Sequence, residues 1–373
     1  MHRSLTRLLA VVALLTAGAP PALATVLDVG IGQTYSTLAA AVAAAGAGDT
    51  IDVFGGTYTN QSAVIDVPLT IQGVDGTPVF TATTALANGK GFLVLNASAT
   101  IDNIEFSDAA APGGNGAGIR YQAGNLVVEN STFVGNQDGI LATPSTGGTG
   151  SVLVQDSTFL NNGVASGPYA GFAHAIYATN VASLTVEDST FQGTQAGHDV
   201  KSRAAVTVVT GNYLDDGVTG TTSYAVDISN GGQATITGNT IVQGVNTENP
   251  AMVAYAAEGL TYSDNSLLVE GNVFENSLPY GSIGIDNHAS GVTAEVTCNA
   301  FDDVANPVVG PANQRGNVLN AGLPACALPE PPGLAILLTG CLALLGLARW
   351  PGRGNRIRPV RMSAIVDRRI CQH

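Results

Sequence analysis

The segment Val128-Glu129-Asn130-Ser131-Thr132-Phe133 decides the fold of this chain, because copies of it recur along most of the sequence. Val154-Gln155-Asp156-Ser157-Thr158-Phe159 and Val186-Glu187-Asp188-Ser189-Thr190-Phe191 repeat it almost residue for residue. With looser copies included, the segment ends at residues 106, 133, 159, 191, 214, 241, 274 and 301, so the period is 23 to 33 residues. Such self-similarity is typical of a solenoid, in which each repeat packs on its neighbours.

Each repeat holds short strands of alternating pattern, rich in β-branched and aromatic residues and broken by Asn, Asp and Gly. No long helical periodicity intervenes, and the period is too long for a leucine-rich repeat. It fits one turn of a parallel β-helix, in which coils stack about 4.8 Å apart and equivalent residues form ladders. We therefore predict an all-β solenoid.

The beginning of this body supports the same fold. Tyr35–Ala45 is predicted to form a short helix, ended by Gly46, that caps the exposed end of the solenoid. Asp49–Phe54 is then predicted to begin the first strand.

The stretch Gln33–Tyr58, with Gly48-Asp49-Thr50-Ile51 and Gly55-Gly56-Thr57-Tyr58, resembles the opening of pectin-lyase-like proteins. The resemblance spans about residues 30–320 and implies a right-handed parallel β-helix solenoid of about nine or ten coils, with a short N-terminal capping helix. That superfamily contains lyases, glycoside hydrolases, esterases, epimerases and phage adhesins, so the resemblance implies a fold and leaves the reaction open.

The two ends of the chain read as targeting segments. Residues 1–24 combine a positive start, a short apolar run and a small-residue cleavage site, which predicts a secretory signal and export. Between Thr25 and Leu328 there are five basic residues against 26 acidic residues, a net charge of −21. A basic face for nucleic acid is therefore not expected, and self-repulsion favours a soluble exported body.

The C-terminal end carries the order Pro-Glu-Pro at 329–331, an apolar run at 333–348 and an arginine cluster. By composition this is a marginal membrane segment with a positive flank. The order resembles the PEP-CTERM sorting signal of Gram-negative bacteria that make exopolysaccharide, which implies a cell-envelope or extracellular location and removal of the tail by a sorting protease. A plain C-terminal anchor is the alternative, because the tail continues to His373.

We predict four parts, namely a signal peptide at 1–24, a parallel β-helix domain at 25–325, a PEP-CTERM-like sorting or membrane segment at 326–358 and a basic tail at 359–373. Only Cys298 and Cys326 could form a disulfide in the exported body, and whether they pair is left open. The body should bury enough apolar surface to fold alone, so we expect a monomer.

A second strand follows each repeat, with an inward Ile or Val and an outward residue after it. The outward residues form the column Arg120, Leu141, Tyr177, Lys201 and Asp227, with Asp286 further along. Two positions on, the same face carries Thr143, Thr179, Arg203, Ser229 and His288. Lys201 and Arg203 are two of the five basic residues of the body, so a positive site is concentrated there.

This column suits the β-elimination of a uronate, which needs a cation for the carboxylate, a base and an acid. Arg203 would hold the carboxylate, Lys201 or His198 would be the base, and Tyr177 or Tyr224 would donate the proton or stack on the sugar. We predict as catalytic residues Lys201, Arg203, His198 and Tyr224, and as substrate-binding residues Tyr177, Asp227 and His174.

Two other interpretations stay open. Asp227 could simply neutralise Lys201 on a non-catalytic β-helix that binds matrix or envelope polysaccharide. A glycoside hydrolase would need two carboxyl groups, of which Asp199 or Asp227 could be one and no convincing second is present. We expect no cofactor or metal centre, with calcium as the one ion that so acidic a body would suit. The expected partner is acidic polysaccharide or extracellular matrix.

Overall fold

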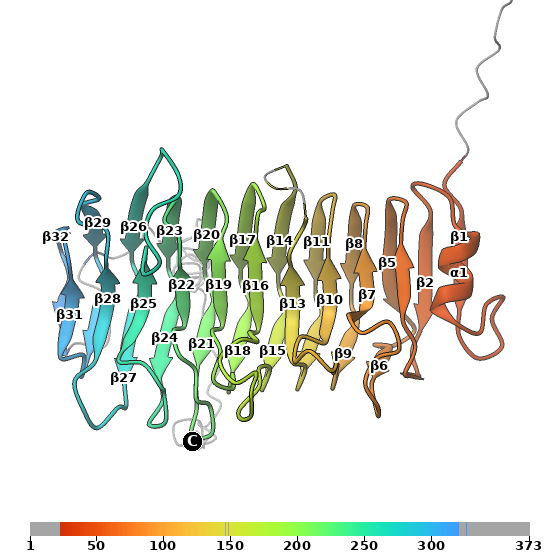
Figure 1. The fold of residues 1–373 in the computed structure, drawn as a ribbon, viewed down its shortest axis with the longest axis horizontal. Helices are drawn as coiled ribbons and strands as arrows, with labels where there is room; N and C mark the ends of the chain where they lie inside the picture. The colour runs from red at the N-terminus through yellow and green to blue at the C-terminus, as the bar shows by residue number, and fades with distance from the viewer. Residues whose placement is uncertain (1–22, 146, 148, 321–325, 327–373) are drawn as a thin grey trace, which may run out of the picture. The chain divides into compact units, whose positions relative to one another are not determined.

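The computed structural model describes residues 23–145, 147, 149–320 and 326. The first compact unit of the chain, Met1–Cys326, contains all of them. Three long parallel sheets run side by side along this unit, and the chain visits each sheet once per coil (Figure 1). The predicted parallel β-helix is therefore confirmed.

The first sheet has 12 strands: β1 (Val26–Val29), β2 (Thr50–Phe54), β5 (Leu69–Val74), β8 (Ala99–Asp102), β11 (Leu126–Glu129), β14 (Ser151–Gln155), β17 (Ser183–Glu187), β20 (Val206–Thr210), β23 (Gln233–Thr237), β26 (Ser266–Glu270), β29 (Ala294–Thr297) and β32 (Ala312–Arg315).

The second sheet has 10 strands: β4 (Ala63–Ile65), β7 (Gly91–Leu95), β10 (Ala117–Tyr121), β13 (Asp138–Ala142), β16 (Ile176–Thr179), β19 (Val200–Arg203), β22 (Val226–Ile228), β25 (Ala251–Tyr255), β28 (Ile283–Asn287) and β31 (Asn306–Val309).

The third sheet has 11 strands: β3 (Thr57–Thr59), β6 (Val79–Thr81), β9 (Glu105–Ser107), β12 (Thr132–Val134), β15 (Thr158–Leu160), β18 (Thr190–Gln192), β21 (Tyr213–Asp215), β24 (Thr240–Gln243), β27 (Val273–Asn276), β30 (Ala300–Asp302) and β33 (Val318–Leu319).

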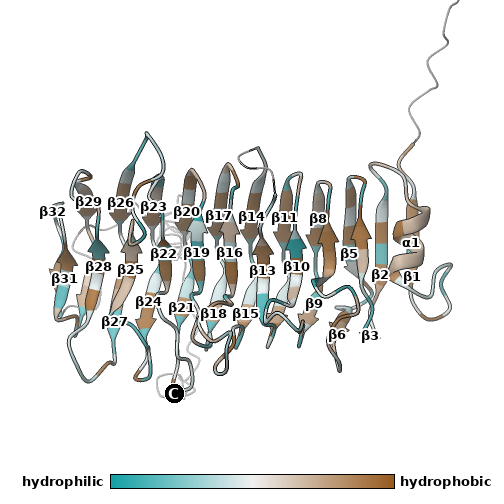
Figure 2. Ribbon diagram, viewed as in Figure 1, coloured by the Kyte–Doolittle hydropathy of each residue, from teal (hydrophilic) through white to brown (hydrophobic). Residues whose placement is uncertain are grey.

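The core is a set of ladders, because parallel pairing in register places equivalent side chains above one another. Figure 2 shows apolar residues recurring on strand after strand. Phe133, Phe159 and Phe191 are fully buried and stack with ring centroids 4.6 and 4.7 Å apart. These aromatic pairs add to the stabilisation that burial alone provides.

A buried asparagine ladder holds the turns between the first and third sheets. The side-chain oxygen of Asn239 accepts the backbone N–H of Asn212 at 2.9 Å, and Asn272 and Asn299 continue the pattern on the next coils. Buried backbone N–H groups that leave the sheet therefore keep acceptors. On the earlier coils Ser157 and Ser189 hold the same corner. The residues before these serines, Asp156 and Asp188, take positive φ angles, which Asn and Asp tolerate better than most residues.

The capping helix α1 (Leu38–Ala44) lies within the predicted range, and Thr37 caps its N-terminus with a bond to the N–H of Ala40. One prediction about this end was wrong. Asp49–Phe54 does not begin the first strand, because β1 precedes the helix and pairs with β2. Pairing with β1 covers the backbone edge that β2 would otherwise expose.

Cys298 and Cys326 form a disulfide, which ties residue 326 to the last coils. Residues 1–22 of the predicted signal peptide, the apolar run at 333–348 and the basic tail lie outside the described residues. Within the described residues, no helix has the length and apolar character needed to cross a membrane.

Candidate functional site

The outward face of the second sheet aligns the predicted site residues. Tyr177 on β16 pairs with Lys201 on β19, and Lys201 pairs with Asp227 on β22. Thr179 on β16 pairs with Arg203 on β19. Lys201 and Arg203 are two residues apart on β19, so their side chains leave the same face of this strand. The predicted order of this column is confirmed. The next residue of the column beyond Asp227 is Ala254 on β25, a strand that sequence reasoning missed. Asp286 on β28 follows Ala254 in the column.

Lys201 is buried and makes a close ion pair. Its Nζ lies 2.7 Å from Oδ2 of Asp227 and 3.4 Å from Oε1 of Glu258. Asp227 Oδ2 also accepts the hydroxyl of Ser229 at 2.8 Å. A buried pair of this kind is costly to break, because either partner alone would be an uncompensated charge.

Arg203 is held by three different groups. Its Nη2 contacts both oxygens of Glu258, at 2.6 and 2.7 Å. Its Nε donates to the hydroxyl of Tyr177 at 2.9 Å, and its Nη1 donates to the side chain of Asn230. Burial alone would lower the pKa of Arg203, but the bonds to Glu258 and Tyr177 outweigh it and raise the pKa.

Glu258 is the member of this charged network that sequence reasoning missed. It lies in the connection after β25. The residues of β25 carry no charge, so neither this strand nor the loop after it stood out as part of a site. Its carboxylate bridges the two cations, and its side chain stays 44% exposed. Glu258 is thus the solvent-facing half of a network whose other carboxylate, Asp227, is buried.

His174 and His198 lie at the corner before the second sheet, and their rings accept hydrogen bonds from backbone N–H groups. Nδ1 of His174 accepts the N–H of His198, and Nδ1 of His198 accepts the N–H of Tyr224, both at 3.1 Å. The two imidazoles stack with centroids 4.7 Å apart. Oδ1 of Asp138 begins this column by accepting the N–H of His174 at 2.9 Å.

These bonds decide the protonation of both histidines. Since Nδ1 accepts, a neutral ring carries its proton on Nε2. Burial, followed by the charges of Lys201 and Arg203, lowers the pKa of His198 to about 3. Burial also holds the pKa of His174 well below its usual value. Neither ring therefore offers a free lone pair at neutral pH, which makes His198 a poor candidate for the general base.

The two tyrosines differ in position. Tyr177 lies under both cations, with Lys201 Nζ and the guanidinium carbon of Arg203 each 5.9 Å from its ring centroid. Tyr224 lies at the corner against His198, and burial raises its pKa. Tyr177 is therefore the phenol that directly contacts the Arg203 guanidinium.

The two carboxylates considered for hydrolysis, Asp199 and Asp227, each bond a neighbouring side chain through one oxygen. Asp199 is buried and accepts the hydroxyl of Thr194 at 2.6 Å, while Asp227 pairs with Lys201. Within the described residues, no cluster of three or more His, Cys, Asp or Glu side chains could hold a metal ion.

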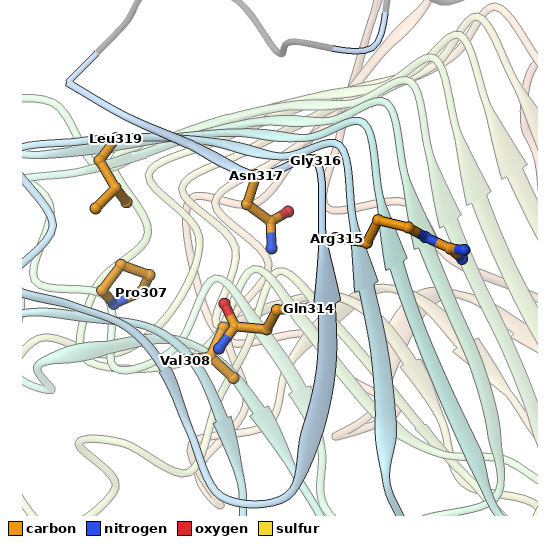
Figure 3. Close-up of a pocket in the computed structure, with 7 residues that line it drawn as sticks. All are labelled: Pro307, Val308, Gln314, Arg315, Gly316, Asn317 and Leu319. Atoms are coloured by element: carbon orange, nitrogen blue, oxygen red, sulfur yellow. The ribbon is translucent and has the colours of Figure 1, made fainter.

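The pocket in Figure 3 lies elsewhere, at the last coil, between β31, β32 and β33. Its volume is about 350 Å³, and Gln314, Val308 and Leu319 are among its lining residues. Arg315 points away from the other labelled side chains. This pocket therefore brings together none of the predicted site residues.

Comparisons with known proteins agree with the fold. Residues 69–214 match the family model described as "Right handed beta helix region", which confirms the predicted handedness. No curated protein matches the chain.

The solved structures that resemble it include the following two. The PL6 family alginate lyase AlyGC is 19% identical with a TM-score of 0.47, over 74% of this chain and 39% of that chain. The pectin methylesterase from Aspergillus niger is 13% identical with a TM-score of 0.36, over 84% of this chain and 92% of that chain. This chain spans well under half the length of the alginate lyase, and similarities at this level carry no argument about activity.

Proposed function

We propose that this chain binds acidic polysaccharide and holds a uronate carboxylate at Arg203 and Lys201, with Tyr177 beside the sugar. The observation that supports this function is the position of Glu258. Its carboxylate bridges Nζ of Lys201 and Nη2 of Arg203, as the carboxylate of a bound uronate would. A guanidinium is suited to bidentate carboxylate binding, so an incoming uronate can take over this contact.

Replacing the Glu258 carboxylate at Arg203 by a ligand carboxylate should require little free energy. Glu258 is 44% exposed and Arg203 is 25% exposed, so the pair resembles a surface ion pair, worth about 1 kcal/mol or less. Asp227 keeps Lys201 neutralised throughout, because this pair is buried and lies behind Glu258 in the network. A ligand carboxylate therefore displaces Glu258 without exposing a buried unpaired charge.

The charge of the body makes this contact specific. With a net charge of −21 between Thr25 and Leu328, the protein repels polyanions over most of its surface. Binding must therefore depend on the local cations.

A β-eliminating lyase is the second candidate, favoured by the Tyr177–Arg203 contact. The hydroxyl oxygen of Tyr177 accepts from Arg203 Nε, so its own proton remains available for a leaving oxygen. In elimination a base removes the C5 proton, the C5 electrons form the C4–C5 double bond, and the departing C4 oxygen takes the Tyr177 proton. Lys201 can be that base only after losing the proton it donates to Asp227.

We further propose that the protein is an exported monomer of the cell envelope or extracellular matrix. Its tail would be removed by a sorting protease, and binding would need no cofactor, with calcium as the one ion left to test. If Tyr177 and Lys201 do not act on the ligand, the same site makes the chain a non-catalytic polysaccharide-binding β-helix.

The test is calorimetric titration of the full-length protein with alginate, polygalacturonate and glycosaminoglycan oligomers, with and without calcium. Arg203→Gln should weaken binding of the recognised polymer about tenfold or more, as expected for loss of a charge-assisted bond. The control is Arg315→Gln on β32, outside the second sheet. Equal binding by wild type and Arg203→Gln would overturn the proposed site.

The same samples, followed by ultraviolet absorbance for unsaturated product, separate a lyase from a binding protein. Absorbance that Tyr177→Phe loses while it still binds would establish elimination. Binding without absorbance on every polymer would leave the non-catalytic function.

A further inference from the structure

Arg120 lies on the same outward column as the candidate site, three coils before Lys201. It pairs with Leu141, which pairs with Tyr177, which pairs with Lys201. The neighbouring side chains Ile119 and Tyr121 point into the core and are fully buried. Arg120 is therefore the nearest preceding cation on the face that carries Lys201 and Arg203.

The guanidinium of Arg120 lacks the acceptors that a buried arginine normally has. Its Nε and Nη1 are buried and have no hydrogen-bond partner in the described part of the chain. No ion pair there involves it either. The flanking residues of the column, Val94 and Leu141, are only 3% and 5% exposed. Burying two N–H donors without acceptors is unfavourable, so folding by itself does not account for an arginine here.

Asp138 is the nearby acid, but it does not complete the pair. Its Oδ1 accepts the backbone N–H of His174, and its Oδ2 is buried without a partner. Burial raises the pKa of Asp138 to about 7, so its compensating charge is incomplete at neutral pH. Arg120 as a whole stays half-buried, which leaves part of it open to a ligand on the outer face.

We propose that Arg120 is a second carboxylate-binding subsite, which takes another uronate of the same polysaccharide chain that Arg203 holds. This subsite rests on the proposed function at Arg203. A ligand carboxylate on the outer face would supply the negative charge that this arginine, which has no ion pair within the described residues, lacks. Three coil spacings place the two strands about 14 Å apart along the solenoid. A single uronate cannot contact both arginines, so the ligand is an oligomer of several sugars lying along the axis.

The melting temperature of an Arg120 variant distinguishes a subsite arginine from a structural one. A structural Arg120 would stabilise the folded state, and replacing it would lower the melting temperature. A subsite arginine with two unpaired donors gives the free protein no such stabilisation, so Arg120→Gln should leave the melting temperature unchanged or raise it.

The experiment titrates full-length wild type, Arg120→Gln, Arg203→Gln and Arg315→Gln with a monouronate and with oligouronates of increasing length. For wild type the affinity should rise once the oligomer spans both arginines. Arg120→Gln should bind the monouronate as wild type does and should bind the long oligomers roughly tenfold to hundredfold more weakly. Arg315→Gln should match wild type at every length.

Long-oligomer binding by Arg120→Gln equal to that of wild type would overturn the subsite and leave the Arg203 site intact. A lower melting temperature with equal loss at every ligand length would overturn it too, in favour of a structural role. Failure of the proposed function looks different, because wild type would then bind no uronate, or Arg203→Gln would bind as wild type does.

Discussion

Glu258→Gln tests whether the chain's own carboxylate competes with the ligand. The substitution keeps an oxygen that Arg203 can bond and removes the charge that holds Arg203 and Lys201. If a uronate must displace Glu258, removing this competitor should tighten binding. If Glu258 instead helps to hold the ligand, the same change should weaken it.

The size of the effect follows from exposure. Glu258 is 44% exposed and Arg203 is 25% exposed, so we discount their close contact to the value of a surface pair, about 0.5–1 kcal/mol. This corresponds to a roughly two- to fivefold lower Kd. The free energy of unfolding should fall by no more than about 1 kcal/mol, because the buried Lys201–Asp227 pair remains.

The assay is calorimetric titration of the full-length protein with the recognised oligouronate at low salt. Removing any negative charge reduces the general repulsion of a polyanion, so the control must remove one elsewhere. Glu275→Gln does this, since Glu275 is exposed on β27 of the third sheet. Binding by Glu258→Gln that is weaker than wild type, or no tighter than that of Glu275→Gln, would refute the competition.

Three further predictions concern the scaffold of the site. Asp227→Leu should lower the free energy of unfolding in urea by about 3–5 kcal/mol because it removes the close partner of the buried Lys201 and leaves only Glu258, 3.4 Å away, and adding Lys201→Met should restore most of the loss; a single variant as stable as wild type would contradict this. The pKa of His198 is about 3 in the folded protein and near 6.5 when unfolded, so the unfolded state binds the extra proton between these values and stability falls as pH falls from about 6.5. His198→Asn, whose oxygen can accept the same backbone N–H, should make this slope shallower by about 1.4 kcal/mol per pH unit, and an unchanged slope in urea titrations at several pH values would disprove it. Phe159→Ala should lower the free energy of unfolding by about 3–5 kcal/mol, whereas Phe172→Ala, at a side chain 75% exposed, should change the urea midpoint little. Similar losses of unfolding free energy in the two variants would count against the aromatic ladder.

The solenoid could be predicted because every coil packs on its neighbours in the same way. Each coil solves the same packing problem, so the sequence carries a period, and in-register pairing converts that period into columns of neighbours. This is why Lys201 could be placed between Tyr177 and Asp227 from spacing alone. The same reasoning overlooked β25, whose outward residue Ala254 is small and uncharged.

The contacts that define the site could not be read in this way. Glu258 reaches Arg203 from a loop two coils away, and no periodic signal marks a loop residue. The histidines stood out by type and position, yet their Nδ1 atoms bond the backbone of the next coil. That role depends on where the corner N–H groups leave the sheet, which is a property of the folded backbone.

The most direct test of the central claim is a crystal structure of the full-length protein with a bound oligouronate. The proposed function predicts a ligand carboxylate within hydrogen-bonding distance of Arg203 Nη2, with Glu258 turned away and the Lys201–Asp227 pair unchanged. A ligand bound elsewhere, with Glu258 still paired to Arg203, would contradict it.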